Sequence, residues 1–235
     1  NTFIDQNSGR LYAAGTDASP SGIIIADLKG DPTNPTLLAN FALGAYTHDV
    51  YVHEDTPVAY FRNTGVGIFD FTDLANPAMV SIIFSYTDPG YAHSGWCDDE
   101  FETMYWCTET QGTGVHISDF SDVGGYTADV ESVFRSTLLA PTHTNSVAHN
   151  PIIRGDYLFI SYYHEGLQIY DISNRLNPQL FAYYDTHPQN TDYANFRGSW
   201  GVYPYLPSCN IITTDTENGL FVLATSFIFP VEMSH

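Results

Sequence analysis

Histidine followed by a polar or acidic residue recurs along this chain at regular intervals. The pairs are His48-Asp49, His93-Ser94 and His149-Asn150. Each histidine precedes a glycine of a later apolar run by 17 to 21 residues, so the three pairs hold matching places in a longer pattern. Neutral imidazole nitrogens are common ligands of transition metals, and carboxylate oxygens are the ligands that Ca²⁺ prefers. Because the three histidines hold the same place in this pattern, we expect their side chains to lie in the same environment.

Two main interpretations of these histidines remain open, and direct catalysis by them is a third alternative. In the first, His48, His93 and His149 bind copper or zinc, and Asp49 is a further ligand or orients one. His143 fits the spacing less well and is a weaker candidate, and calcium held by carboxylates is an alternative ion. In the second, each histidine hydrogen-bonds the backbone of the neighbouring repeat and binds no ion. Neither interpretation assigns a catalytic residue.

The elements that must position these histidines belong to a repeat. A glycine followed by alternating apolar residues and an aspartate occurs four times, and a fifth copy lacks the aspartate. The copies begin at Gly22, Gly65, Gly114, Gly166 and Gly219. The four aspartates are 43, 49 and 52 residues apart, and further short apolar runs separated by turn residues flank each copy. About four short strands in a period near 45 residues are typical of a β-propeller blade.

The repeats therefore predict an all-β protein, a single β-propeller domain over residues 1–235 with five visible blades. The predicted repeat units are 1–46, 47–91, 92–141, 142–198 and 199–235. Because the first residue is not Met and the last unit lacks its outer strand, we expect the propeller to be incomplete at its N-terminus. The first strand of a propeller blade lines the central channel, so the three histidines would converge on the axis. Trp200 holds the matching place in the fifth unit.

Composition excludes several classes of partner. The 235 residues contain 7 Lys and Arg against 27 Asp and Glu, which gives a net charge of −20. Nucleic acids and anionic membrane surfaces require clustered basic residues, so neither is an expected partner. The longest strongly apolar stretch, residues 219–231, is shorter than the roughly 20 residues of a transmembrane helix. The sequence predicts no transmembrane segment.

The spacing of two cysteines leaves open whether they form a disulfide. Cys97 and Cys107 flank the acidic residues 98–100, and a hairpin there would bring them opposite each other. A disulfide and two free thiols are both compatible with this spacing.

No phosphate-binding glycine loop, dinucleotide fingerprint or Gly-x-Ser-x-Gly motif occurs in the sequence.

Four segments resemble the choice-of-anchor B family of LVIVD-repeat β-propellers. They are residues 46–50, 91–96, 148–173 and 196–205. The resemblance implies a bacterial protein that is extracellular or attached to the cell surface. His48-Asp49 is also similar to inner-strand starts of the selenium-binding protein and methanethiol oxidase family, which implies copper held by histidines. The cysteine segments diagnostic of that second family are absent, so its oxidase activity is not expected.

We therefore expect a secreted or cell-surface β-propeller that is a non-catalytic binding or assembly scaffold. Its expected partners are an extracellular protein, a glycan or other subunits of a surface assembly. The alternative is a metal-binding propeller, a carrier or a metalloenzyme, with histidines on the axis. The loops at residues 86–91, 141–147 and 186–196 are expected to form the binding face.

Overall fold

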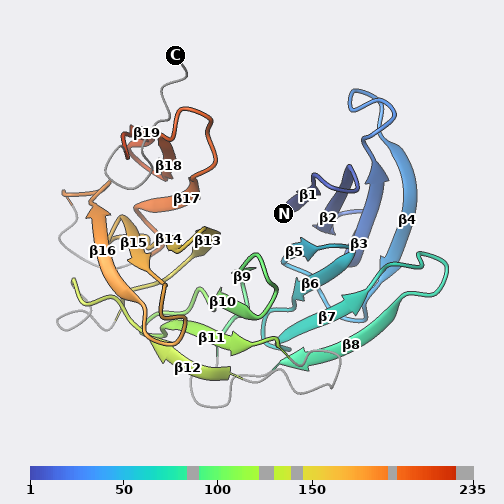
Figure 1. Ribbon diagram of the computed structural model, residues 1–235, viewed down its shortest axis with the longest axis horizontal. Coiled ribbons are helices and arrows are strands. Elements are labelled where there is room, and N and C mark those ends of the chain that lie inside the picture. Colours follow the sequence, from blue (N-terminus) through green and yellow to red (C-terminus); the bar gives the residue numbers. More distant parts are fainter. Residues whose placement is uncertain (84–89, 122–129, 139–144, 190–194, 226–235) are drawn as a thin grey trace.

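The computed structural model describes residues 1–83, 90–121, 130–138, 145–189 and 195–225. These residues form five antiparallel sheets arranged around one axis, which confirms the predicted all-β propeller (Figure 1). In each sheet the strands follow one another from the axis outward. No helix in the described part of the chain is long and apolar enough to cross a bilayer.

The five blades contain four, four, four, four and, within the described residues, three strands. Their bounds are β1 (Thr2–Asp5), β2 (Arg10–Thr16), β3 (Ser19–Asp27) and β4 (Thr36–Ala42); β5 (Asp49–His53), β6 (Thr56–Tyr60), β7 (Val66–Asp70) and β8 (Ala78–Ile83); β9 (Ser94–Cys97), β10 (Thr103–Cys107), β11 (Val115–Asp119) and β12 (Val130–Phe134); β13 (Asn150–Arg154), β14 (Tyr157–Ser161), β15 (Leu167–Asp171) and β16 (Gln179–Tyr184); β17 (Ser199–Tyr203), β18 (Ile211–Asp215) and β19 (Gly219–Leu223).

In the second, third and fourth blades the recurring glycine stands directly before the third strand, and the recurring aspartate ends that strand. Gly166 stands directly before β15 with a φ of 76°, and a Cβ there would lie 2.2 Å from the carbonyl oxygen of Tyr184. Glycine is required because it alone combines a left-handed backbone with this close approach. At the other end, Asp171 Oδ1 accepts a hydrogen bond from the Ser173 amide at 2.9 Å. This aspartate turn ends the strand.

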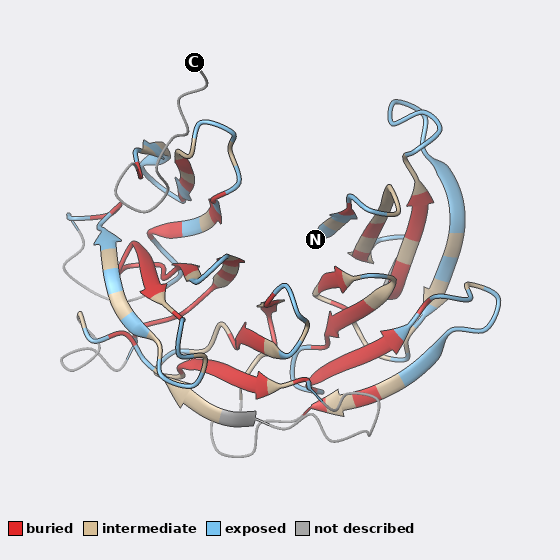
Figure 2. Cartoon of the chain, viewed as in Figure 1, coloured by how far each residue is buried: buried red, intermediate tan, exposed pale blue. Residues whose placement is uncertain are grey.

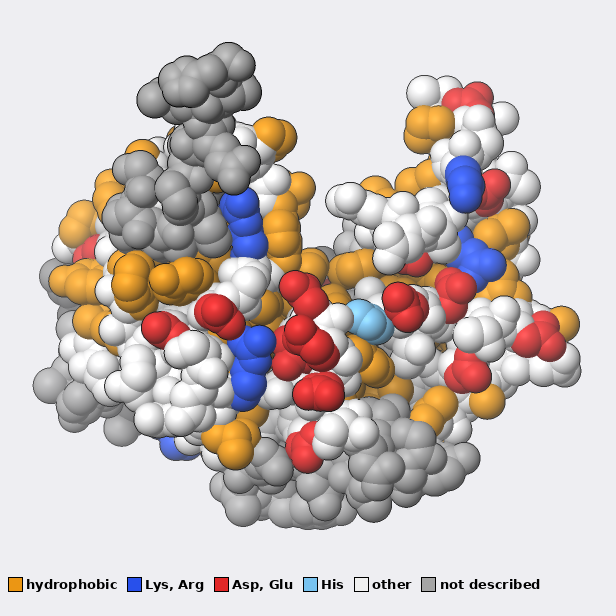
Figure 3. Space-filling view, in the orientation of Figure 1, with side chains coloured by type: hydrophobic (Ala, Val, Ile, Leu, Met, Phe, Trp, Pro, Cys, Tyr) orange, Lys and Arg blue, Asp and Glu red, His pale blue; other side chains and the backbone are white. Residues whose placement is uncertain are grey.

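Burial follows the distance from the axis. In the second and third blades the inner and middle strands are largely buried, as are the middle strands of the fourth, whereas β4 and β16 at the outer edge are mostly exposed (Figure 2). The inner strands contact one another in the order β1, β5, β9, β13 and β17. Figures 1 and 3 show a gap in the ring between the blade of β1 to β4 and the blade of β17 to β19. Figure 3 also shows acidic side chains gathered near the centre of one face.

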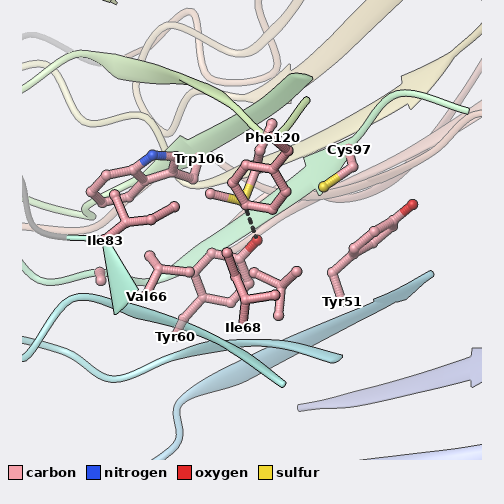
Figure 4. Close-up of a cluster of buried hydrophobic side chains, with 11 residues drawn as sticks. Tyr51, Tyr60, Val66, Ile68, Ile83, Cys97, Trp106 and Phe120 are labelled. Atoms are coloured by element: carbon pink, nitrogen blue, oxygen red, sulfur yellow. Dashed lines mark hydrogen bonds between the residues drawn. The ribbon is translucent and has the colours of Figure 1, made fainter. Parts of the chain in front are cut away.

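Neighbouring blades pack through buried aromatic side chains. Between the second and third blades, Tyr60 of β6 and Trp106 of β10 belong to one cluster of buried residues (Figure 4). The Tyr60 hydroxyl donates to Met104 Sδ at 3.4 Å. Gly95 of β9 lies so close that a Cβ there would be 2.4 Å from the Tyr60 hydroxyl. This close contact packs β6 of the second blade against β9, the inner strand of the third blade.

Cys97 and Cys107 form no disulfide, so the first of the two alternatives left open by the sequence is excluded. Both side chains are buried free thiols. The predicted hairpin exists as β9 and β10, but its register pairs Cys97 with Met104 and Cys107 with Ser94. Because residues 104 and 107 are three apart on one strand, the two cysteines point to opposite faces of the sheet.

Candidate metal centre

The three predicted histidines lie side by side at the starts of inner strands. His48, His93 and His149 directly precede β5, β9 and β13. The ring centroids of His48 and His93 are 4.4 Å apart, and those of His93 and His149 are also 4.4 Å apart. Each backbone N–H donates to a carbonyl at the end of the second strand of its own blade, at 2.8 to 3.0 Å. This shared bond gives the three histidines equivalent positions.

A carboxylate completes the group. Glu109 follows β10, and its Oε2 lies 3.5 Å from Nε2 of His93. Its Oε1 lies 3.6 Å from Nε2 of His149. Ligand atoms of His48, His93 and Glu109 all lie within 4.8 Å of one another, and their types are those that hold metal ions.

Sequence reasoning missed Glu109 because its place in the repeat carries a different residue type in each blade. Arg62, Glu109 and Tyr163 all follow the second strand of their blades, and all three have a positive φ, of 58°, 46° and 37°. Non-glycine residues rarely adopt this conformation, and such strain clusters at functional sites. An alignment of the repeats at the ends of their second strands would have identified the position of Glu109.

The hydrogen bonds of Ser94 assign the tautomer of His93. Ser94 Oγ donates its proton to the carbonyl oxygen of His149 at 2.6 Å. The same Oγ lies 3.0 Å from Nδ1 of His93, so Nδ1 must be the donor in that bond. Nε2 of His93 therefore carries a lone pair, and this lone pair faces Glu109.

His149 is held in the same tautomer by the fifth blade. Its Nδ1 lies 2.5 Å from the carbonyl oxygen of Trp200, which only accepts, so Nδ1 carries the proton. Its side chain is 1% exposed, and Nε2 is buried without a hydrogen-bond partner in the described part of the chain. That nitrogen also faces the carboxylate of Glu109. A buried acceptor without a hydrogen-bond partner beside an anion is the arrangement expected of a cation site.

Burial keeps the three imidazoles neutral. It lowers the pKa of His48 and of His149 to about 4, and that of His93 to about 2. Burial also raises the pKa of Glu109, although the Tyr163 hydroxyl opposes this by donating to Oε1 at 2.5 Å. The close approaches of His93 and His149 to Glu109 are therefore not ion pairs at neutral pH.

The separations fit a cation between these groups. At 3.5 and 3.6 Å they are too long for hydrogen bonds. Ligands that each lie about 2.0–2.2 Å from a tetrahedral Zn²⁺ are about 3.4 Å from one another. Each of the two imidazole nitrogens and the Glu109 oxygen nearest to it are thus spaced as two ligands of one ion.

His48 is oriented by Tyr91, which directly precedes His93's blade. The Tyr91 hydroxyl lies 2.8 Å from Nδ1 of His48 and accepts a hydrogen bond from Nε of Arg62. His48, His93 and His149 are each linked through the Nδ1 side to the following blade, directly or through Ser94. For His93 and His149 the structural interpretation and the metal interpretation are therefore compatible, because they use opposite nitrogens of each ring.

The remaining predicted residues are placed differently. Asp49 does not join the group, since its Oδ1 accepts from the Val50 amide at 2.8 Å. It lines a cavity of about 180 Å³ between the inner strands, and burial raises its pKa to about 7. As the first residue of β5 it points away from its neighbour His48, because consecutive strand residues alternate. His143 lies outside the described residues.

One blade matches a known repeat. Residues 147–186 match the LVIVD repeat family, and this match covers the fourth blade together with His149. No curated protein matches the sequence.

Several solved structures share the fold. A periplasmic gluconolactonase of Pseudomonas aeruginosa is 9% identical with a TM-score of 0.70, over 97% of this chain and 68% of its own. The β-propeller domain of Cps50 (Swd1) from Myceliophteria thermophila is 10% identical with a TM-score of 0.64, over 94% and 68%. The computationally designed Ika8 protein is 6% identical with a TM-score of 0.59, and the chain covers 56% of its length. At these identities the similarity establishes the fold alone.

Proposed function

We propose that this chain binds one divalent transition metal ion on the propeller axis. His93 and Glu109 are ligands in this proposal, together with His48, His149 or both. The observation that carries it is the pair of Nε2 lone pairs, of His93 and His149, that face the Glu109 carboxylate at 3.5 and 3.6 Å. Without a cation, this arrangement holds a half-buried carboxylate against two acceptors, which is unfavourable.

The donor set favours zinc or copper over calcium. Imidazole nitrogens suit Zn²⁺ and Cu²⁺, whereas Ca²⁺ prefers six to eight oxygen ligands. Ser94 and the Trp200 carbonyl supply the outer hydrogen bonds that metal-binding histidines use on the nitrogen opposite the metal. Ligation by a few side chains from the inner strands leaves coordination positions for a ligand, as in a carrier or a metalloenzyme.

Elemental analysis of natively purified protein, before and after chelation, tests this proposal. We expect one equivalent of zinc or copper, which chelation removes and which the chelated protein takes up again in a calorimetric titration. Glu109→Gln should abolish this uptake, and Glu102→Gln, which changes an exposed carboxylate of the same blade, should not. Calcium alone, or no metal with no uptake, would overturn the proposal.

A second candidate function is a binding scaffold at the cell surface. The observation that favours it is a set of exposed aromatic side chains on the fourth and fifth blades. They are Phe181, Tyr183, Tyr184, Trp200, Tyr203 and Tyr205, which are 38–59% exposed. Exposed aromatic surface is typical of binding sites for proteins and for sugar rings. In this proposal the chain is an extracellular or surface-attached bacterial protein of the choice-of-anchor B type.

Direct binding assays separate the two candidates. Glycan arrays and pull-downs of surface proteins should capture a partner with the wild-type chain. Tyr183→Ser combined with Tyr203→Ser should lose it, and Glu109→Gln should retain it. Capture that depends on Glu109 instead would assign the partner to the axial site. Protease treatment of intact native cells should degrade the protein, and full protection would contradict a surface location.

A further inference from the structure

Arg62 lies beside the axial histidines and is held by two aromatic rings. Its guanidinium carbon is 3.9 Å from the ring centre of Tyr46 and 5.3 Å from that of Tyr91. Its Nε donates to the Tyr91 hydroxyl at 2.8 Å, and its backbone pairs with Ala92 of the next blade. A flexible side chain is thus oriented in advance, which reduces the entropy lost when its remaining donors bind a ligand.

No carboxylate pairs with Arg62 among the residues that the structure describes. This is notable in a chain with 27 acidic residues and 7 basic ones. Arg175 and Arg197, by contrast, lie 3.6 and 3.2 Å from the carboxylates of Asp98 and Glu217. Arg62 is exposed, and with Nε engaged its two Nη groups form a fork that matches the two oxygens of a carboxylate.

One atom connects this fork to the metal centre. The Tyr91 hydroxyl lies 2.8 Å from Nε of Arg62 and 2.8 Å from Nδ1 of His48. The guanidinium nitrogen and the imidazole nitrogen are therefore at most twice that distance apart. A ligand held by Arg62 would therefore lie beside His48, one of the side chains proposed to bind the ion.

We propose that the axial site takes a small organic carboxylate as its ligand. The carboxylate oxygens accept hydrogen bonds from the Nη groups of Arg62, and the ligand reaches the metal ion from there. This inference rests on the metal site proposed above. Arg62 adds its positive charge to that of the ion, because the neutral imidazoles and Glu109 contribute none. The proposal concerns binding and involves no bond-making step.

Acetate and its neutral counterpart acetamide are suitable probes. Protein loaded with Co²⁺ in place of the native ion has a visible absorption spectrum that responds to ligands near the metal. We expect acetate to change this spectrum with saturation, and acetamide at equal concentration to leave it unchanged. Arg62→Gln should weaken acetate binding by about tenfold or more, since a charged bidentate pair is lost. Arg62→Lys keeps the charge without the fork, so its affinity for acetate should lie between those of the wild type and Arg62→Gln.

The controls separate failure of this inference from failure of the metal site. Arg10→Gln removes the same charge from the start of β2 and should leave acetate binding intact. If wild-type protein binds no Co²⁺, the metal proposal and this inference both fall. If Co²⁺ binds but acetate acts equally on the wild type and on Arg62→Gln, only the carboxylate inference is overturned. Should Arg62→Gln fail to fold, the same comparison with Arg62→Lys decides.

Discussion

Glu109 and His149 belong to neighbouring blades and face each other, with Oε1 3.6 Å from Nε2. The opposite nitrogen of the same imidazole ring donates to the carbonyl oxygen of Trp200 in the next blade. One side chain thus joins two blades with Nδ1 and presents a buried, unprotonated Nε2 to a carboxylate. The bond from Nδ1 to Trp200 stabilises the ring of blades. The approach of Nε2 to Glu109 requires a cation to become favourable.

Replacing Glu109 by Gln should separate metal binding from stability. We expect metal affinity to fall by more than about 100-fold, because loss of outer hydrogen-bond partners alone lowers metal affinity by about 10–100-fold. The metal-free variant should melt at the same temperature as the wild type or higher, since a half-buried carboxylate beside two acceptors is removed. Calorimetric titration and thermal denaturation check these outcomes. A large drop in metal-free stability would instead assign Glu109 a structural role.

Ser94→Ala should weaken metal binding without removing a ligand. Without Oγ, the tautomer of His93 is no longer held, and we expect metal affinity to fall by about 10–100-fold at unchanged stoichiometry. Ser81→Ala is the matched control, because Ser81 is also buried and its Oγ has no hydrogen-bond partner in the described residues. Equal affinity in both variants would contradict the assigned tautomer.

The metal-free protein should lose stability as the solution is acidified. In the unfolded chain the histidines have a pKa of about 6.5, whereas burial lowers the pKa of His48 and His149 to about 4 in the fold. Below pH 6.5 the unfolded state binds more protons, so the free energy of unfolding falls as the pH drops toward 4. Urea denaturation of chelated protein at several pH values measures this loss. The double variant His48→Gln, His149→Gln should show a shallower dependence, and an unchanged slope would refute the assignment.

Gly95→Ala should loosen the contact between the second and third blades. A Cβ at residue 95 would lie 2.4 Å from the Tyr60 hydroxyl and 2.7 Å from Cβ of Trp106. Overpacking of this kind costs about 1–3 kcal/mol, which thermal or chemical denaturation resolves. Gly30→Ala is the control, because the nearest atom is 3.9 Å away. Similar stability of the two variants would show that this interface yields more easily than its geometry indicates.

All three cysteines should titrate as thiols. Cys97, Cys107 and Cys209 are free, and burial raises the pKa of Cys107. We expect three equivalents of reactive thiol in denatured, unreduced protein and almost no reaction of Cys97 and Cys107 in the native state. A reductant should leave the melting temperature unchanged. Detection of one thiol in place of three would contradict the register of β9 and β10.

The local pattern of the sequence determined the blades and the repeat positions of the histidines. Gly166 and Asp171 mark a strand because they meet local requirements, a left-handed backbone and a turn that accepts the next amide. Such requirements act within a few residues, so they recur visibly at every repeat. The same spacing placed His48, His93 and His149 at equivalent strand starts, and the structure brings these three residues together.

Only the tertiary structure decided which groups complete the site. Glu109 lies opposite His149 because two blades pack side by side, which joins residues that are 40 positions apart in the chain. Asp49 is adjacent to His48 in sequence, yet strand alternation turns it away from the site. The direction of each Nε2 follows from hydrogen bonds between blades. Spacing along the chain carries no information on such contacts, because they depend on how the sheets pack around the axis.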